Sequence, residues 1–296
     1  MTAATGGRLD WVCIGAQKAG TSTLFRILRD HPDLCIPPGK EDPLFHHEVT
    51  DAAVDAYLAE RFAGAAPNVR CGTVTPHYMS SPETAARVHR FAPGTRVVAL
   101  LRDPVERAFS QYRMSVRWGK ETRSFDAAVE AQLDDLDQEV PVDANSEVDT
   151  YVLRGLYGLI LTPWFELFGS EHVHVEFTTD LDARPTEVLS RVHRFLGVEP
   201  RETGREGLRA HEGPPAHRLR GVRRPVAGAL RRVGVLDRIP VERKEQLADT
   251  LERALARLFP AQPDRVPGSS EASLRARYAV DREPLERLLG RAVPWH

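Results

Sequence analysis

Short apolar runs, typical of buried strands, alternate along most of the chain with stretches in which apolar residues recur at helical spacing. The clearest predicted strands are Trp11–Ile14, Arg96–Leu101 and His172–Phe177, with shorter apolar pieces at Leu34–Ile36 and from Cys71. The predicted helices lie around Leu24–Leu28 and Val105–Tyr112 and over Asp51–Phe62, Pro82–Phe91, Tyr151–Phe168, Pro185–Leu196, Val241–Phe259 and Arg282–Leu289. Strands that alternate with helices indicate an α/β fold with a central, mostly parallel sheet flanked by helices on both faces.

The 296 residues are 42% hydrophobic and 28% charged, which allows a sizeable core. This length fits one large α/β domain or two small ones. We predict a disordered tail over residues 1–9 and a single domain over residues 10–296.

Two segments differ sharply in charge from the rest. Residues 119–149 carry ten acidic side chains against Lys120 and Arg123, and we interpret them as a solvated helix and loop. Residues 205–238 carry nine arginines against three acidic residues. The region 205–240 is either a lid over an anionic ligand, a substrate-binding insertion or solvated surface, because loops of this length are often functional or disordered.

The remaining composition limits the class of protein. A formal net charge of −2 gives no global attraction to nucleic acid or to anionic membranes, so any anion site is local. The three cysteines Cys13, Cys35 and Cys71 lack metal-ligand spacing and are expected to be reduced thiols. We find no run long enough to span a membrane and no signal-peptide core, so we expect a cytoplasmic protein without a membrane span.

The clearest candidate for chemistry is the loop between the first strand and the first helix. It contains Gly15, Lys18 and Gly20, and the hydroxyl residues Thr21, Ser22 and Thr23 open the helix. Unpaired N–H groups and the helix dipole both face such a loop, which favours an anion. The pattern is close to the G-x-x-x-x-G-K-[ST] phosphate loop, but its lysine lies inside the loop.

Two further loops are expected at the same edge of the sheet, because ligands of such sheets bind outside the carboxyl ends of the strands. One carries Glu41, and the other carries Arg102, with Ser110 about two turns into the following helix. An arginine contacts phosphate with two nitrogens, and a hydroxyl completes the oxygen shell. Two separate cationic groups, at Lys18 and Arg102, indicate a ligand with two phosphate groups. Taken alone, Arg102 is better explained by a structural pair to Asp103 or Glu106.

The order of these motifs resembles the PAPS-dependent sulfotransferases, most closely the heparan-sulfate-type branch and its bacterial relatives. The resemblance rests on Gly-Ala-Gln-Lys-Ala-Gly-Thr-Ser-Thr-Leu at 15–24, His-Pro-Asp at 31–33, Lys-Glu-x-x-x-Phe at 40–45 and Leu-Leu-Arg-Asp-Pro-Val-Glu-Arg-Ala-Phe-Ser-Gln-Tyr at 100–112. It continues weakly through Phe195–Gly197, Leu288–Arg291 and Trp295. The resemblance implies a P-loop-NTPase-like three-layer fold.

It also implies roles for individual residues. Lys18 would neutralise charge on the leaving phosphate, and Glu41 would act as general base on the acceptor hydroxyl. The donor PAPS, and its product PAP, would be bound by Lys18, Ala19, Gly20, Thr21, Ser22, Thr23, Arg102 and Ser110. No metal is implied. The acceptor would be a small molecule, a glycan or a lipid that carries a hydroxyl.

This chain departs from the family pattern at several points. Val74 stands where heparan-sulfate-type enzymes carry a lysine before Thr-Pro, so a second catalytic cation is not expected there. The late loop that helps to bind the 3′-phosphate has only a faint counterpart at 264–267, which includes Arg265. The paired cysteines and the membrane anchor of the animal enzymes are also missing, which favours a soluble enzyme that acts on a smaller acceptor.

Other interpretations stay open at this point. His46, His47 and His77 lie in loops near the expected site and are alternative bases. A P-loop nucleotide kinase or NTPase would use the same loop. A protein that binds PAP or PAPS without turnover would keep Lys18 and Arg102 without needing Glu41.

Overall fold

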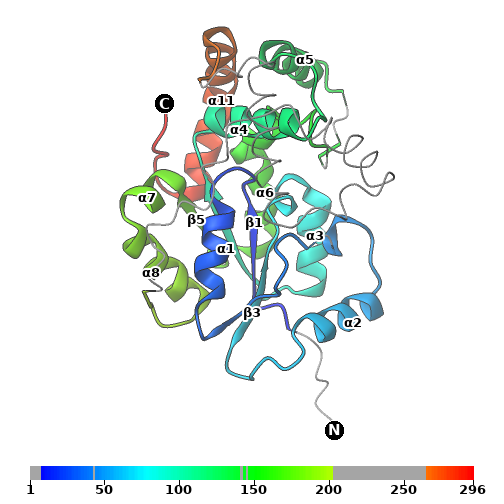
Figure 1. Cartoon of the computed structure of the whole chain (residues 1–296), viewed down its shortest axis with the longest axis vertical. Coiled ribbons are helices and arrows are strands. Elements are labelled where there is room, and N and C mark those ends of the chain that lie inside the picture. Colours follow the sequence, from blue (N-terminus) through cyan, green and yellow to red (C-terminus); the bar gives the residue numbers. More distant parts are fainter. Residues whose placement is uncertain (1–7, 43, 141–142, 145, 203–264) are drawn as a thin grey trace, which may run out of the picture.

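The computed structural model describes residues 8–42, 44–140, 143–144, 146–202 and 265–296. Within these residues, five parallel strands form one sheet in the order β2-β3-β1-β4-β5 (Figure 1). The strands are β1 (Trp11–Gly15), β2 (Leu34–Cys35), β3 (Arg70–Val74), β4 (Arg96–Leu101) and β5 (Val173–Phe177). The strand with the glycine-bearing loop therefore lies at the centre of the sheet, as expected for a phosphate-binding α/β fold.

Helices cover both faces of this sheet (Figure 1). The helices are α1 (Thr21–Arg29), α2 (Asp51–Arg61), α3 (Pro82–Phe91), α4 (Pro104–Arg117), α5 (Phe125–Asp137), α6 (Tyr157–Phe168), α7 (Thr178–Ala183), α8 (Pro185–Leu196) and α11 (Gly268–Leu289). Short 3-10 turns are η1 (Leu44–His46), η2 (Tyr78–Ser80) and η3 (Leu153–Gly155). The ring of His31, just after α1, contacts the ring of His193 of α8 at a centroid distance of 4.6 Å, so these two helices share one face. On the other face, Trp164 of α6 donates to the carbonyl of Met79.

The core has two parts. The larger part fills both faces of the sheet, and its strands β1 and β4 are buried almost throughout. The smaller part joins α4, α5, η3 and α11 above the carboxyl ends of the strands, around Phe109, Tyr112, Phe125, Tyr151 and Tyr278. This second core holds α4, which carries residues of the expected site, in a fixed position against the sheet.

The predicted fold class is confirmed, with differences at several element boundaries. The predicted helix Tyr151–Phe168 is not continuous, because a 3-10 turn precedes α6, which begins at Tyr157. The carboxylate of Asp281 on α11 caps the start of α6 by accepting from Gly158 N at 2.6 Å and from Leu159 N at 2.8 Å. The last predicted helix, Arg282–Leu289, is the end of the longer α11. The expected helix 241–259 and the region 205–240 lie outside the described residues.

Residues 8 and 9, which we predicted to belong to the disordered tail, contact the folded domain. Leu9 is buried, and Arg8 donates to the carbonyl of Val69 at 2.6 Å. These two residues pack against the sheet because Leu9 is apolar and the arginine finds a free carbonyl next to β3. Residues 1–7 lie outside the described part of the chain.

Candidate active site

The loop after β1 has the backbone geometry of an anion cradle. Lys18 has φ 72° and Gly20 has φ 96°, both in the left-handed region, and α1 begins directly afterwards at Thr21. The neighbouring strand tips hold this loop in place. Ala16 N donates to Leu100 O at 2.7 Å, and the hydroxyl of Thr178 donates to Ala19 O at 2.6 Å. The loop therefore turns its early helix amides toward the carboxyl edge of the sheet.

The ammonium of Lys18 lies among other cations. Its Nζ contacts the sulfur of Met114 on α4 at 3.8 Å. Burial, and after it the positive charges of Arg117, Arg102, Lys40 and Arg107, lower the pKa of Lys18 to about 8. A lysine whose pKa falls in this way sits in positive potential that an anion would relieve.

Arg102 lies beside Lys18, directly after β4. Its Nη1 donates to the carbonyl of Lys18 at 3.5 Å, and Tyr157 donates its hydroxyl to the carbonyl of Arg102 at 2.9 Å. The guanidinium also pairs with Glu106, Nη2 to Oε2 at 2.8 Å. The structural pair that the sequence left open therefore exists, but it is solvent-exposed and of the kind that contributes little to stability.

Helix α4 brings a hydroxyl to the same place. Asp103 caps the helix by accepting from the amides of Val105 and Glu106. Ser110 is half-buried and lies one turn before Met114, the residue that contacts the Lys18 ammonium. The predicted donor-binding residues lie in the loop after β1 and at the start of α1, directly after β4, and on α4. Ala19 and Thr21 are buried, and Lys18, Gly20, Ser22, Thr23, Arg102 and Ser110 are half-buried.

Glu41 lies in the loop after β2, which is hydrogen-bonded to the carboxyl end of β3. Its amide donates to Val74 O at 3.0 Å, and the next amide, of Asp42, donates to the buried hydroxyl of Thr75 at 3.0 Å. The backbone of Glu41 has φ 73°. Only Lys18, Glu41 and Glu139 have positive φ among the described non-glycine residues, and such strain clusters at functional sites.

The carboxylate of Glu41 is held in its ionised form. Lys40 Nζ donates to Oε1 at 2.7 Å, and His77 Nε2 lies 3.9 Å from Oε2. Burial would raise the pKa of this carboxyl, but the hydrogen bond and charge of Lys40, with His77 and Lys18, hold it below its usual range. An ionised carboxylate that feels the charge of Lys18 is suited to accept a proton next to the cation site.

Four functional candidates were not predicted as a group. Gln17, His77, Glu147 and Arg154 form a connected polar cluster beside Glu41. Glu147 belongs to the acidic segment 119–149, for which the sequence predicts a solvated helix and loop. This prediction is wrong for Glu147, which is half-buried, and for Glu121, which is buried. The one available signal was Arg154, a lone arginine in an apolar stretch, which needs polar partners if it is buried.

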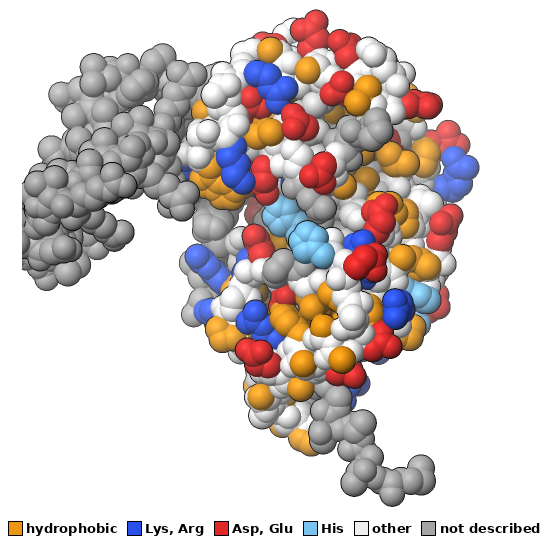
Figure 2. Space-filling view, turned by 90° about the vertical axis from the view of Figure 1, so that its right-hand side faces the viewer, with side chains coloured by type: hydrophobic (Ala, Val, Ile, Leu, Met, Phe, Trp, Pro, Cys, Tyr) orange, Lys and Arg blue, Asp and Glu red, His pale blue; other side chains and the backbone are white. Residues whose placement is uncertain are grey.

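The three loop histidines lie in different surroundings. His77 and His46 are half-buried with their ring centroids 6.1 Å apart, whereas His47 is exposed. Burial and the charges of nearby His77, His47, Arg154 and Arg87 lower the pKa of His46 to about 4. Histidine side chains gather near the middle of the face in Figure 2, with acidic side chains around them.

Comparison with known proteins identifies relatives of this chain. A family model described as a sulfotransferase domain matches residues 9–211. The chain is 30% identical to the mouse protein "Heparan sulfate glucosamine 3-O-sulfotransferase 6" over 191 residues, 63% of this chain and 51% of that protein. It is 32% identical to "Membrane-associated sulfotransferase kil1" of Dictyostelium discoideum over 117 residues, 39% of this chain and 25% of that protein. The chain thus spans about half or less of the length of these relatives.

A solved structure shares the fold. The crystal structure of a sulfotransferase from Alicyclobacillus acidocaldarius matches with a TM-score of 0.66 and 24% identity, covering 97% of each chain. Among the helices that the structure describes, none is both long and apolar enough to cross a membrane. In the same residues, no group of three or more His, Cys, Asp and Glu side chains is arranged to hold a metal ion.

Proposed function

Since this chain belongs to the sulfotransferase domain family, we propose that it transfers the sulfuryl group of PAPS to a hydroxyl acceptor. The observation that carries the proposal is the convergence of Lys18, Arg102 and Glu41 at one edge of the sheet. Two cations and a carboxylate of these types match the needs of an anionic donor and a proton-releasing acceptor. The relatives' names indicate the reaction class.

The residues at this edge fit a bisphosphorylated adenosine. Lys18, with its pKa lowered by burial and by surrounding cations, gains from a bound anion, and the amides that open α1 are available as donors. We infer that the segment Lys18–Thr23 binds the 5′ end and that Arg102 and Ser110 bind the 3′-phosphate, with the Arg102–Glu106 pair opening to free the guanidinium. When bound, PAPS supplies the sulfuryl group.

The reaction asks of the protein mainly positioning and charge stabilisation, as in phosphoryl transfer. Lys18 stabilises the negative charge that develops on the leaving phosphate oxygen. Glu41 accepts the proton of the acceptor hydroxyl, and a base in hydrogen-bond reach contributes about 10²–10⁴-fold. Since Lys40 occupies Oε1, the free Oε2 of Glu41 is the oxygen that meets the acceptor.

The acceptor class remains a proposal. Val74 of this chain stands where the resemblance implies a lysine, and the carboxylate of Glu147 lies behind Glu41, 3.7 Å from His77 Nε2. The missing lysine favours a smaller hydroxyl compound, whether small molecule, glycan or lipid, over a glycosaminoglycan. That residues 10–296 form one domain and that the protein is cytoplasmic also remain predictions.

The test separates binding from transfer. With labelled PAPS and a panel containing a glucosaminide, a phenol and a primary alcohol, the wild type is expected to label at least one acceptor. Glu41→Gln is expected to reduce transfer about 10²–10⁴-fold while PAP still raises the melting temperature. Glu171→Gln, at an exposed carboxylate far from the site, is the matched control. Transfer that survives in Glu41→Gln would refute the role of Glu41, and binding of PAP without any turnover would favour a non-catalytic binding protein.

A further inference from the structure

A cluster of polar side chains behind Glu41 has no part in the transfer described above. It comprises Gln17, His77, Glu147 and Arg154, which come from the loop after β1, the turn after β3, the loop before η3, and η3 itself. Arg154 is only 2% exposed and Gln17 8%. Burying such groups costs free energy unless they serve each other or a ligand.

Arg154 fixes which way the amide of Gln17 points. Its Nη1 donates to Gln17 Oε1 at 2.8 Å, and since arginine only donates, that atom of Gln17 is the oxygen. The amide nitrogen of Gln17 then faces His77 Nε2 at 3.4 Å and Glu147 Oε1 at 3.5 Å. Because this nitrogen is a donor, Nε2 of neutral His77 is an acceptor and its ring proton is on Nδ1.

Hydrogen-bond acceptors outnumber donors around His77 Nε2. Two carboxylate oxygens face this nitrogen, Glu147 Oε1 at 3.7 Å and Glu41 Oε2 at 3.9 Å. The contacts to His77 Nε2 are thus one donor, the Gln17 amide, and two carboxylate oxygens. The second oxygen of Glu147 is also buried without a hydrogen-bond partner. A proton that arrived on Nε2 would therefore be shared with a carboxylate on either side.

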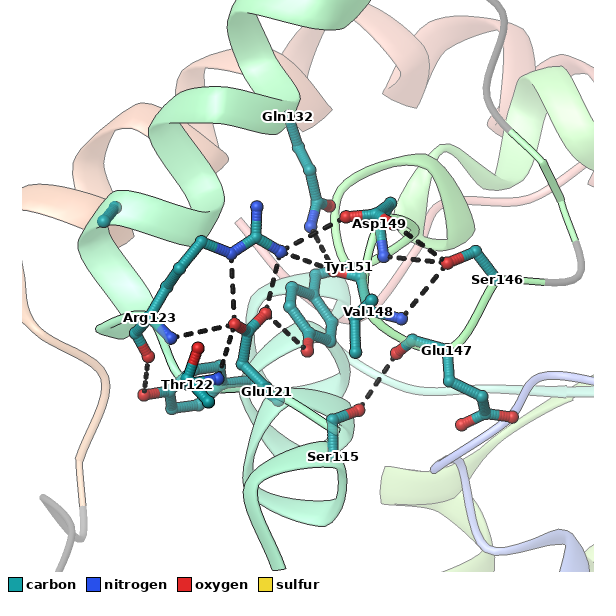
Figure 3. Close-up of polar contacts among 12 residues, drawn as sticks. Ser115, Glu121, Thr122, Arg123, Gln132, Ser146, Glu147, Val148, Asp149 and Tyr151 are labelled. Carbon is teal, nitrogen blue, oxygen red and sulfur yellow. Dashed lines mark hydrogen bonds and ion pairs between the residues drawn. The ribbon is translucent and has the colours of Figure 1, made fainter. Parts of the chain in front are cut away.

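The carboxylate of Glu147 is held in this position from behind. The backbone carbonyl of Glu147 accepts from the Ser115 hydroxyl at 2.9 Å and from the Gln111 amide at 3.1 Å. The adjoining segment is fixed by Arg123, which bridges Glu121 and Asp149 (Figure 3). In Figure 3 the side chain of Glu147 points away from that network, so its carboxylate is free to face His77.

Burial, helped by two neighbouring cations, keeps His77 neutral. The titratable and charged groups are Arg154 on η3, Glu147 in the preceding loop, Lys40 and Glu41 in the loop after β2, and His46 on η1. Burial and Arg154, with Lys40, lower the pKa of His77, while Glu147 and Glu41 oppose them. His77 is thus unprotonated at neutral pH, with its lone pair beside the base.

We propose that His77 is a positioning residue that relays the proton: Glu41 takes it from the acceptor hydroxyl and passes it to His77 Nε2. This inference rests on the proposed function. In the step, the acceptor oxygen forms the bond to sulfur, the bond from sulfur to the 5′-phosphate oxygen of PAP breaks, and the proton leaves through His77 to solvent. The 3.9 Å separation of Glu41 and His77 closes by rotation of the half-exposed Glu41 side chain.

The pH dependence of turnover tests the relay. The assay follows labelled sulfate released from PAPS with water as the acceptor, so that no other acceptor needs to be known. In the wild type, kcat is expected to fall with pH below 6.5, as His77 is protonated and loses its lone pair. In His77→Gln, kcat is expected to drop about 10–100-fold. The acid limb, meaning the fall of kcat at low pH, is expected to shift to lower pH, where only Glu41 titrates. His47→Gln, at the exposed neighbour, is expected to match the wild type.

Chemical rescue gives a second readout that loss of packing cannot imitate. His77→Ala is expected to regain at least about tenfold activity with added imidazole, and not with added acetamide. PAP is expected to raise the melting temperature of both variants as in the wild type. An unchanged acid limb in His77→Gln together with no rescue in His77→Ala would overturn the relay. If the relay fails in this way but Glu41→Gln still loses turnover, the proposed function stands without the relay. If Glu41→Gln keeps its turnover, the role of Glu41 as general base is refuted.

Discussion

At the scale of single residues, strain and charge meet at the same positions. Lys18 and Glu41 both adopt left-handed backbone geometry that costs free energy for residues with a Cβ. Lys18 carries a second cost, because its ammonium is buried among other cations. Neither feature helps the fold, and a bound anion would offset the cost of burying the Lys18 charge.

The lowered pKa of Lys18 predicts how PAP binding depends on pH. The unbound protein begins to lose the Lys18 proton above about pH 8, whereas a bound phosphate stabilises the charged form and raises the pKa. The affinity for PAP is therefore expected to fall by up to about tenfold per pH unit above that value. Calorimetry in two buffers of different ionisation enthalpy should detect proton uptake on binding. Lys120→Ala is the charge-matched control at an exposed site, and Lys18→Ala should bind PAP weakly and without uptake.

At the scale of elements, the carboxyl tips of three strands and the start of one helix define the site. The tip of β1 carries the phosphate loop, the tip of β4 carries Arg102, and the tip of β3 anchors Glu41 by two backbone amides. The edge strand β5 stabilises this arrangement: Glu176 accepts from Arg191 of α8 at 2.7 Å and from His174 at 2.9 Å.

This ion-paired glutamate predicts an acid-sensitive contribution to stability. Although burial opposes it, Arg191 and His174 lower the pKa of Glu176 to about 2. A carboxyl with a lowered folded-state pKa stabilises the fold at neutral pH, and this is lost as pH falls from about 4.5 toward 2. Glu176→Gln is expected to reduce the free energy of unfolding by about 2–3 kcal/mol at pH 7, measured by urea denaturation. Glu171→Gln should have little effect, and an equal loss for Glu176→Gln at pH 3 would contradict the assignment.

At the scale of the whole molecule, α11 ties the second core to the sheet. Asp281 caps α6, and Arg275 pairs with Asp103 at 3.0 Å, the residue that caps α4 next to Arg102. The end of the chain described here thus supports the helix that carries Ser110. The predicted helix Arg282–Leu289 missed residues 268–281 of α11, because that part mixes polar and apolar residues and packs on the smaller core.

The sequence predicted what depends on local pattern and missed what depends on tertiary contact. The strands β1, β4 and β5 and the loop at Lys18 follow from apolar runs, glycines and a helix start, so they could be predicted. That Arg102 touches the Lys18 carbonyl follows from the parallel order of β1 and β4, which the fold class implies. The cluster of Gln17, His77, Glu147 and Arg154 could not be foreseen, since the residues are distant in sequence and share no spacing.

The most direct test of the account compares the affinities of PAP and adenosine 5′-phosphate for the wild type and for two variants. The wild type is expected to prefer PAP by at least about tenfold, since only PAP carries the 3′-phosphate that we assign to Arg102 and Ser110. Arg102→Ala should abolish this preference, whereas Lys18→Ala should weaken both ligands and keep it. Arg184→Ala, which breaks a similar exposed pair four residues apart, should change neither affinity. Equal affinity of the wild type for PAP and for ATP with magnesium, or a preference for PAP that survives in Arg102→Ala, would contradict the account.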